Sequence, residues 1–210
     1  MTRIPEEERL FLLSERDRVF WEQPGCVLAG MDEVGRGPLA GPVVVGLAVM
    51  PSEPLLRYVN DSKKVTEKRR EVLHGQIRET ALCCITAWVE PAVIDEINIL
   101  EATKLAFVKA FEAANQEMPI TDALLDALSG LNMPVRQHSL IHGDALSYSI
   151  ACASIFAKVE RDRYMIEMDK LYPQYGFARN KGYGTAEHIE AIKTYGPCPI
   201  HRRSFIQKWI

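Results

Sequence analysis

Residues 26–50 read CVLAGMDEVGRGPLAGPVVVGLAVM, and this stretch decides the fold. Two apolar runs, residues 26–31 and 43–50, flank the turn-rich segment GRGPLAG at 35–41. Apolar residues at nearly every position are typical of strands that are buried on both faces, so we expect a pair of buried strands. The Gly-rich segment joins these strands and does not open a helix, which disfavours a dinucleotide-binding loop.

The rest of the chain adds further helices and strands. Apolar residues at helical spacing predict helices, and short apolar runs predict strands. The predicted helices cover residues 67–79, 100–116, 148–172 and 185–196, with a short helix from Pro91, and the predicted strands cover 82–89, 123–125 and 135–141. Thr66 and Thr185 are the expected N-caps of the first and last of these helices, and Val72, Leu73, Gln76 and Ile77 are expected on one face of the first. This order predicts an α/β domain, residues 24–210, with one mixed β-sheet flanked by helices. Residues 1–23 are expected to form a charged, helical N-terminal segment packed on that domain.

Length and composition exclude several classes of protein. The 210 residues are 47% hydrophobic and 25% charged, which is typical of an ordinary globular chain. The longest uncharged run, residues 37–52, is interrupted by Pro and Gly, so no membrane span and no membrane partner are expected. The charged N-terminus does not resemble an export signal, and five cysteines without repeated CxxC spacing favour a reducing cytoplasm.

Charge is distributed unevenly along the chain. Residues 1–33 hold eight acids and four bases, a net charge of −4, whereas residues 156–210 hold ten bases and six acids, a net charge of +4. A positive face could bind a polyanion, but a solvated surface explains the counts equally well.

Carboxylates follow three apolar or turn segments. Asp32 and Glu33 follow VLAGM, Asp126 ends ALLD, and Asp144 precedes the longest predicted helix. Consecutive strand side chains point to opposite faces, so Asp32 and Glu33 can share a site only if the backbone leaves the regular pleat there. Each carboxylate alone is equally well explained as a polar strand end or a helix-terminal acid. Together, without matching Cys or His ligands, they indicate Mg²⁺ or Mn²⁺ and phosphoryl chemistry.

The segment DEVGRGPLAGPV at 32–43 closely resembles the opening motif of type II ribonuclease H, the ribonuclease HII family, in its bacterial form. Further motifs follow in order over about residues 26–206. They are DSKK at 61–64, NIL at 98–100, Asp126, Gly143-Asp144, ASIFAKV at 153–159 with RDR at 161–163, YPQYGF at 172–177, KGYGT at 181–185 and HRRSF at 201–205.

The resemblance implies a ribonuclease H-like fold, with C-terminal helices adding to the substrate groove, and a nucleic-acid substrate. Asp32, Glu33, Asp126 and Asp144 match four catalytic acids that coordinate two divalent ions, Mg²⁺ or Mn²⁺. The family cuts the RNA strand of RNA/DNA hybrids and cuts 5′ to single ribonucleotides in duplex DNA, leaving 3′-hydroxyl and 5′-phosphate ends. The implied cellular roles are ribonucleotide removal and RNA primer removal, and we expect a monomer.

The resemblance also implies substrate contacts. Gly35, Arg36 and Gly37 match a loop that reads the ribose 2′-hydroxyl, largely through its backbone, and Tyr183 matches an aromatic residue that packs against the next deoxyribose. Ser62, Lys63 and Lys64 match a phosphate-contacting segment. Taken without the family, these segments are explained as a tight strand connection, a packed tyrosine and a solvated helix start.

Several residues lie outside the expected site. Arg161 and Arg163 are expected to pair with Glu160, Asp162 or Glu167, and Cys83 and Cys84 to lie in the core. The roles of Lys158, Arg202, Arg203, His142 and His201 stay open.

One departure bears on the third acid. Ala127 stands where the family commonly has Gly, and Asp122 competes with Asp126 for that position. The interval between residues 126 and 144 is the one that the family resemblance implies, and this favours Asp126.

Three rival identities remain. They are a ribonuclease H-like nuclease or recombinase that acts on DNA only, a catalytically silent module that binds hybrids, and a type III enzyme. The type III enzyme is disfavoured because no large N-terminal extension is present.

Overall fold

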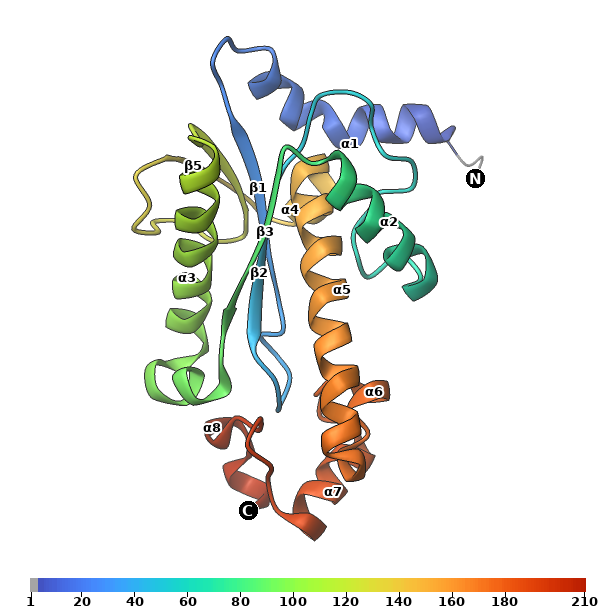
Figure 1. Cartoon of the computed structure of the whole chain (residues 1–210), viewed down its shortest axis with the longest axis vertical. Coiled ribbons are helices and arrows are strands. Elements are labelled where there is room, and N and C mark those ends of the chain that lie inside the picture. Colours follow the sequence, from blue (N-terminus) through green and yellow to red (C-terminus); the bar gives the residue numbers. More distant parts are fainter. Residues whose placement is uncertain (1–3) are drawn as a thin grey trace.

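A mixed five-stranded sheet, with helices on both faces, forms the centre of the computed structural model, which describes residues 4–210 (Figure 1). Residues 1–3 of the expected N-terminal segment lie outside the described residues. The strands are β1 (Leu28–Val34), β2 (Val43–Val49), β3 (Cys83–Val89), β4 (Asp122–Asp126) and β5 (Arg136–Leu140). Their order across the sheet is β3-β2-β1-β4-β5. β1 pairs antiparallel with β2 and parallel with β4, so the carboxyl ends of β1 and β4 meet at one edge.

Eight α-helices and two short 3-10 turns occupy the described residues. They are α1 (Glu6–Trp21), α2 (Glu67–Thr80), α3 (Pro91–Glu117), α4 (Gly143–Leu146), α5 (Tyr148–Leu171), η1 (Pro173–Tyr175), α6 (Phe177–Asn180), α7 (Ala186–Tyr195), α8 (Arg203–Ile206) and η2 (Gln207–Trp209). Thr66 and Thr185 cap α2 and α7 as predicted. The predicted short helix and the helix at 100–116 are the two halves of α3, which meet at Asn98, where φ is 68°. Asn98 Oδ1 accepts the N–H of Leu100 and so caps the second half.

The sheet separates two apolar layers. α3 covers one face and α5 covers the other, as Figure 1 shows with the sheet nearly edge-on. Glycine lets α5 lie close to its face. A Cβ on Gly30 would lie 2.4 Å from the backbone nitrogen of Ile150, and one on Gly46 would lie 2.3 Å from the carbonyl oxygen of Ala153. Side chains larger than hydrogen at these two positions would push the helix off the sheet.

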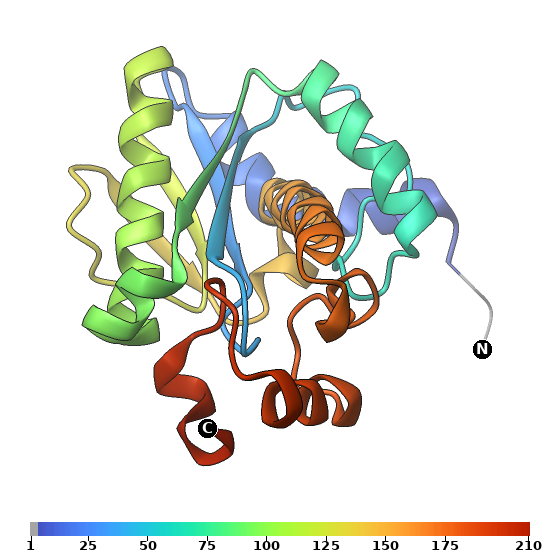
Figure 2. The ribbon, with the colours of Figure 1, turned by 60° about the horizontal axis from the view of Figure 1, so that its bottom comes forward.

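The C-terminal elements pack below the connection between β1 and β2. α6, α7 and α8 gather at that end of the sheet, and Figure 2 shows the segment between α7 and α8 reaching the sheet, where Gly41 N–H donates to the carbonyl oxygen of Ile200. Their own apolar core includes Phe177, Ile192 and Ile206, and it also contains Leu39 and Ala40 from the Gly-rich loop. This loop is therefore held by the C-terminal segment as well as by the sheet.

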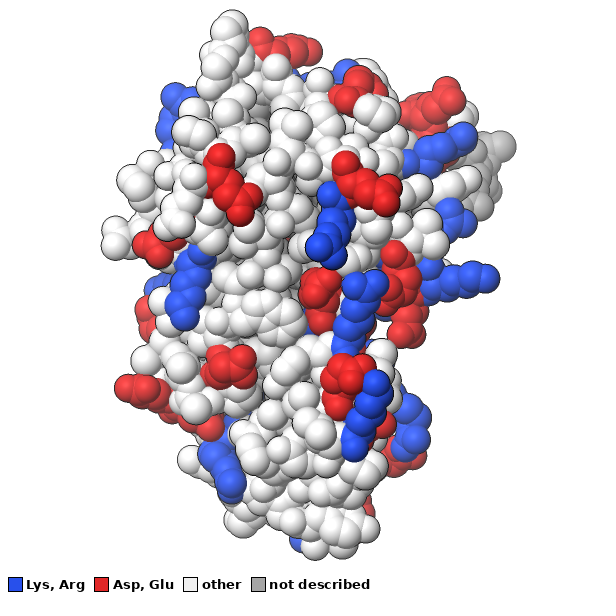
Figure 3. Space-filling view, in the orientation of Figure 1, with Lys and Arg blue, Asp and Glu red and all other residues white. Residues whose placement is uncertain are grey.

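The surface carries charges of both signs. On the face drawn in Figure 3, acidic and basic side chains are interspersed over both halves of the molecule. On this face the opposite net charges at the two ends of the chain therefore do not form separate patches. Among the described helices, none has the length and apolar character that a membrane span requires.

Candidate active site

Three carboxylates converge where the parallel strands end. Asp32 lies near the end of β1, Asp126 is the last residue of β4, and Asp144 lies in α4. One oxygen from each lies within 4.8 Å of the others. Asp126 Oδ1 also accepts the backbone N–H of Gly143 at 2.7 Å, which holds the start of α4 against the end of β4. The topology of the sheet thus brings together acids that are up to 112 residues apart in the chain.

Glu33 lies beside this group but is not part of it. The β1–β2 pairing runs unbroken through Asp32↔Gly46 and Glu33↔Val45, so the backbone does not leave the pleat at the two acids. Asp32 therefore shares the α5 face with Gly46, and Glu33 projects to the opposite face. Glu33 Oε1 accepts a hydrogen bond from Arg36 Nη1 at 3.3 Å. The Glu33 side chain therefore lies at the rim of the acid group, on the other side of the end of β1 from the other three acids.

Asp32 is buried, at 6% exposure. Burial, and then the charge of Glu33, raises its pKa well above the ordinary value, with smaller contributions from Asp126 and Asp144. A hydrogen bond from Ser154 on α5 acts in the opposite direction. Ser154 Oγ also lies 3.0 Å from Ser62 Oγ, a hydroxyl–hydroxyl hydrogen bond that ties α5 to the DSKK segment.

Asp61, which was not among the predicted site residues, is a charged neighbour of Asp144. Burial, and then the neighbouring charge of Asp61, raises the pKa of Asp144. Lys63 Nζ lies 3.8 Å from Asp144 Oδ2 and is the cation nearest to this acid in the ion pairs of residues 4–210. Three carboxylates with so little compensating positive charge are unfavourable without a cation. An all-oxygen donor set of this kind fits a hard divalent ion.

A cavity of about 340 Å³ opens beside the acids. The residues that line it are Asp32, Glu33, Val34, Gly35, Arg36, Gly37, Ser62, Lys63, Ser154, Lys158 and Tyr183. Every predicted substrate-binding residue except Lys64 therefore lines it. Lys64 pairs with Asp61 at 3.5 Å and lines a separate depression between α1 and the start of α2.

Gly37 and Tyr183 face each other across this cavity. A Cβ on Gly37 would have only Tyr183 Cε1 near it, at 3.8 Å, whereas one on Gly35 would lie 2.3 Å from Arg161 Nε. Tyr183 is 44% exposed, so its ring is accessible from the cavity and is not packed in a core. The missing side chain at residue 37 leaves space that a ligand can use.

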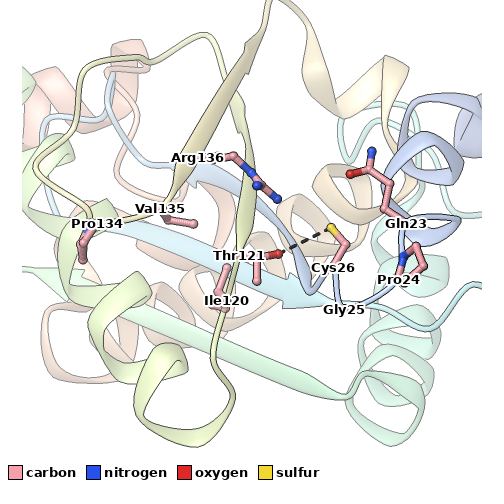
Figure 4. A pocket seen from close by; sticks show the side chains of 9 residues that line it. All are labelled: Gln23, Pro24, Gly25, Cys26, Ile120, Thr121, Pro134, Val135 and Arg136. Carbon is pink, nitrogen blue, oxygen red and sulfur yellow. Dashed lines mark hydrogen bonds between the residues drawn. The ribbon is translucent and has the colours of Figure 1, made fainter.

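Asp122, the rival to Asp126, lies at the other end of β4. Its carboxylate accepts hydrogen bonds from Arg136, at 2.6 Å, and from Thr121. Arg136 first, with His138 and Thr121, holds the pKa of Asp122 well below its ordinary value. A larger cavity, about 620 Å³, opens at that end and is lined by Cys26, Thr121 and Arg136 among others, but by no carboxylate (Figure 4).

The expectation for Arg161 is wrong, and the structure also gives Arg202 a role. Both are fully buried and donate to backbone carbonyl oxygens. Among residues 4–210 Arg161 has no ion-pair partner, because its side chain runs under the Gly-rich loop and donates to backbone carbonyl oxygens there. Arg163 does pair with Glu160, at 3.5 Å, and also with Glu71 on α2. Arg202 is too deeply buried to contact a phosphate.

Lys158 lies at the inner edge of the cavity. Its Nζ donates to Asp162 at 2.7 Å, one turn further along α5. Ser154 and Lys158 have the i, i+4 spacing of one helix face, and this is the signal by which the sequence could have shown that both face the acids.

Comparison with known proteins shows which family the chain belongs to. The chain matches the family of ribonuclease HII over residues 29–208. It is 50% identical over 203 residues to ribonuclease HII of Desulfitobacterium hafniense (strain DSM 10664 / DCB-2), covering 97% of this chain and 77% of that protein. It is 48% identical over 203 residues to ribonuclease HII of Caldanaerobacter subterraneus subsp. tengcongensis, covering 97% and 83%. The crystal structure of ribonuclease H2 from Pyrococcus horikoshii OT3 superposes with a TM-score of 0.71 at 29% identity, covering 86% of this chain and 95% of that chain. The predicted ribonuclease H-like fold is confirmed, and the chain belongs to the ribonuclease HII family of metal-dependent endoribonucleases.

Proposed function

We propose that this protein hydrolyses the RNA strand of RNA/DNA hybrids and the phosphodiester bond 5′ to single ribonucleotides in duplex DNA, leaving 3′-hydroxyl and 5′-phosphate ends. The observation that carries the proposal is the position of the acids. Asp32, Asp126 and Asp144 converge beside a cavity whose wall contains Gly37 and Tyr183. The acid cluster and the cavity lie side by side, and an enzyme that cleaves next to a recognised sugar requires this arrangement. Ribonucleotide removal from DNA and primer removal, by a monomer in the cytoplasm, are the roles that we propose for this activity.

The acids are proposed to hold the metal. Asp32, Asp126 and Asp144 would hold Mg²⁺ or Mn²⁺, and Glu33 would add a carboxylate from the rim. Two such ions supply an activated water and stabilisation of the leaving oxygen. The protein contributes position: the Asp126–Gly143 hydrogen bond and the Ser154 contact fix the acids before substrate arrives.

Sugar recognition is proposed for the opposite wall. The backbone of Gly35, Arg36 and Gly37 would contact the 2′-hydroxyl, because Gly37 has no side chain that would hold the backbone away from a sugar in the cavity. The Tyr183 ring would pack against the following deoxyribose and exclude a second 2′-hydroxyl.

Phosphate contacts are proposed for Ser62 and Lys63 at the cavity and for Lys64 beyond it. Partial burial opposes a charge on Lys63, but Asp144 and Asp61 outweigh it and raise the pKa of this lysine. A cation at this position attracts phosphate without reading a base. We therefore expect cleavage that is independent of base sequence.

A labelled duplex with one ribonucleotide tests the proposal. Cleavage should require Mg²⁺ or Mn²⁺, stop with chelator, and map to the 5′ side of the ribonucleotide. Equal cleavage of an all-DNA duplex would instead indicate a DNA nuclease. Asp32→Asn separates an enzyme from a silent binding module, since a module has no metal-dependent cleavage to lose.

A further inference from the structure

Two buried arginines lie behind the Gly-rich loop. Arg161 on α5 and Arg202 before α8 are both 0% exposed. Within residues 4–210 neither forms an ion pair with a carboxylate, and each instead donates three hydrogen bonds to backbone carbonyl oxygens. A buried guanidinium is expensive to desolvate, so two of them in one place call for an explanation.

Arg202 binds the loop at three points. Its Nε donates to the carbonyl oxygen of Gly41 at 2.9 Å, and its Nη1 donates to that of Arg36 at 2.8 Å. Its Nη2 donates to the carbonyl oxygen of Gly35. The planar guanidinium thereby fixes the two ends of the loop relative to each other.

Arg161 connects the loop to a second segment. Its Nε donates to Pro42 O at 3.0 Å and its Nη2 to Ala40 O at 3.1 Å, while its Nη1 donates to Lys181 O at 3.0 Å. Lys181 is two residues before Tyr183. A backbone hydrogen bond from Leu39 N–H to Gly182 O, at 2.8 Å, adds a second link between the two segments.

Two loop glycines make room for Arg161. Gly35, with φ at 91°, would place a Cβ 2.3 Å from Arg161 Nε. Gly41, with φ at 86°, would place one 2.5 Å from Met165 Sδ and 3.1 Å from Arg161 Nη2. Gly37 has no such contact and faces Tyr183. The glycine at 35 therefore makes room for Arg161, the glycine at 41 makes room for Met165 and Arg161, and the glycine at 37 leaves space in the cavity.

We propose that Arg161 and Arg202 are positioning residues that set the distance between the loop at 35–37 and the Tyr183 ring, and that this distance determines selectivity for a ribonucleotide followed by a deoxynucleotide. The inference rests on the proposed function and deepens it. Neither arginine reaches the cavity. They act by holding two walls that are about 150 residues apart in the chain in one fixed geometry.

The test is the selectivity ratio, kcat/KM for a duplex with one ribonucleotide divided by kcat/KM for a uniform RNA/DNA hybrid. Arg161→Lys and Arg202→Lys keep the positive charge but remove the planar fork. Each should lower the ratio by about tenfold or more, mainly through the single-ribonucleotide substrate, because small displacements of a positioned sugar have large kinetic effects. Arg163→Lys, on the same helix but in exposed ion pairs, is the matched control and should leave the ratio within about twofold.

A second variant leaves both arginines in place. A Cβ on Gly182 would lie 2.4 Å from the carbonyl oxygen of Ala40, so Gly182→Ala pushes the Tyr183 turn away from the loop and should lower the same ratio. Folded variants with the wild-type ratio would overturn the proposal, as would a wild-type ratio near one. A wild-type protein that cleaves neither substrate would overturn the proposed function itself, so the two failures are distinguishable.

Discussion

The Asp17 carboxylate on α1 accepts the backbone N–H of Tyr148 at 2.9 Å, so the N-terminal helix caps the first turn of α5. The same carboxylate also accepts the N–H of Ser149 and the hydroxyl of Ser147. Helix α5 carries Ser154 and Lys158 to the cavity, and α4, with Asp144, immediately precedes it. The N-terminal segment, whose use the sequence left open, thus anchors the helix behind the acids.

Removing this cap should destabilise the protein. Asp17→Ala leaves three buried donors without an acceptor and should lower the free energy of unfolding by about 2–4 kcal/mol. Asp17→Asn keeps one acceptor and should lose less. Urea unfolding measures both, with Glu15→Ala on the exposed side of α1 as control. A loss for Asp17→Ala no larger than for Glu15→Ala would refute the capping role.

The loop glycines should separate stability from substrate binding. Gly35→Ala forces a Cβ against Arg161 at a positive φ and should reduce stability by about 2 kcal/mol or more. The free energy of unfolding of Gly37→Ala should lie within about 0.5 kcal/mol of the wild-type value. Its methyl group should nevertheless raise KM by about tenfold or more, since it occupies the cavity. The prediction fails if Gly37→Ala binds substrate normally or if Gly35→Ala unfolds like the wild type.

The acid cluster should lower the free energy of unfolding of the metal-free protein. Because burial and neighbouring carboxylates raise the pKa of Asp32, the unfolded chain ionises this group first, and stability falls as pH rises above about 4. In chelator at pH 7.5, Asp32→Asn should therefore be more stable than the wild type by about 1 kcal/mol. The same variant should lose cleavage and should lose the rise in melting temperature that Mn²⁺ gives the wild type. A destabilised Asp32→Asn protein would contradict the electrostatic account.

Lowering the pH should destabilise the C-terminal segment, because this segment contains a buried histidine pair. His188 Nδ1 must donate to Tyr183 O, and His201 Nδ1 accepts Cys198 N–H, so His201 Nε2 donates to His188 Nε2 at 3.0 Å. Burial, and then His188, lowers the pKa of His201 to about 4. The unfolded histidine binds its proton near pH 6.5, so stability from this group is complete above that pH and is lost as pH falls towards 4.

The expected loss is up to about 1.4 kcal/mol per pH unit in that range. Urea unfolding of the wild type and of His201→Asn at several pH values measures it. The difference between the two should shrink as pH falls from 6.5 to 4. A difference independent of pH would show that the pair does not titrate as described.

Much of the architecture was predictable because it rests on local patterns. The strand pair around residues 35–41 follows from unbroken apolar runs, and the two halves of α3 follow from Pro91 at the start of the first and from apolar residues at helical spacing in the second. Which side chains of a helix are buried was less predictable. Val72, expected on the apolar face of α2, is 54% exposed, while His74 is buried there against Phe156.

The site was predictable only in part. The family resemblance favoured the four acids, but strand pairing decides that Glu33 lies outside the group that the other three form. The arginines escaped prediction for a different reason. Their partners are backbone carbonyl oxygens up to 167 residues away, and a carbonyl oxygen has no signature in sequence. Only the folded chain shows that Arg161 and Arg202 serve the loop.

The most direct test of the central claim is Mn²⁺ binding to the folded protein, followed by calorimetry or electron paramagnetic resonance. Asp126→Asn keeps the contact to Gly143 but removes a charge from the cluster, and it should weaken Mn²⁺ binding by about tenfold or more. Asp122→Asn, four residues earlier on the same strand, should bind Mn²⁺ like the wild type. Unchanged binding by Asp126→Asn, or an equal loss in Asp122→Asn, would contradict the assignment of the site.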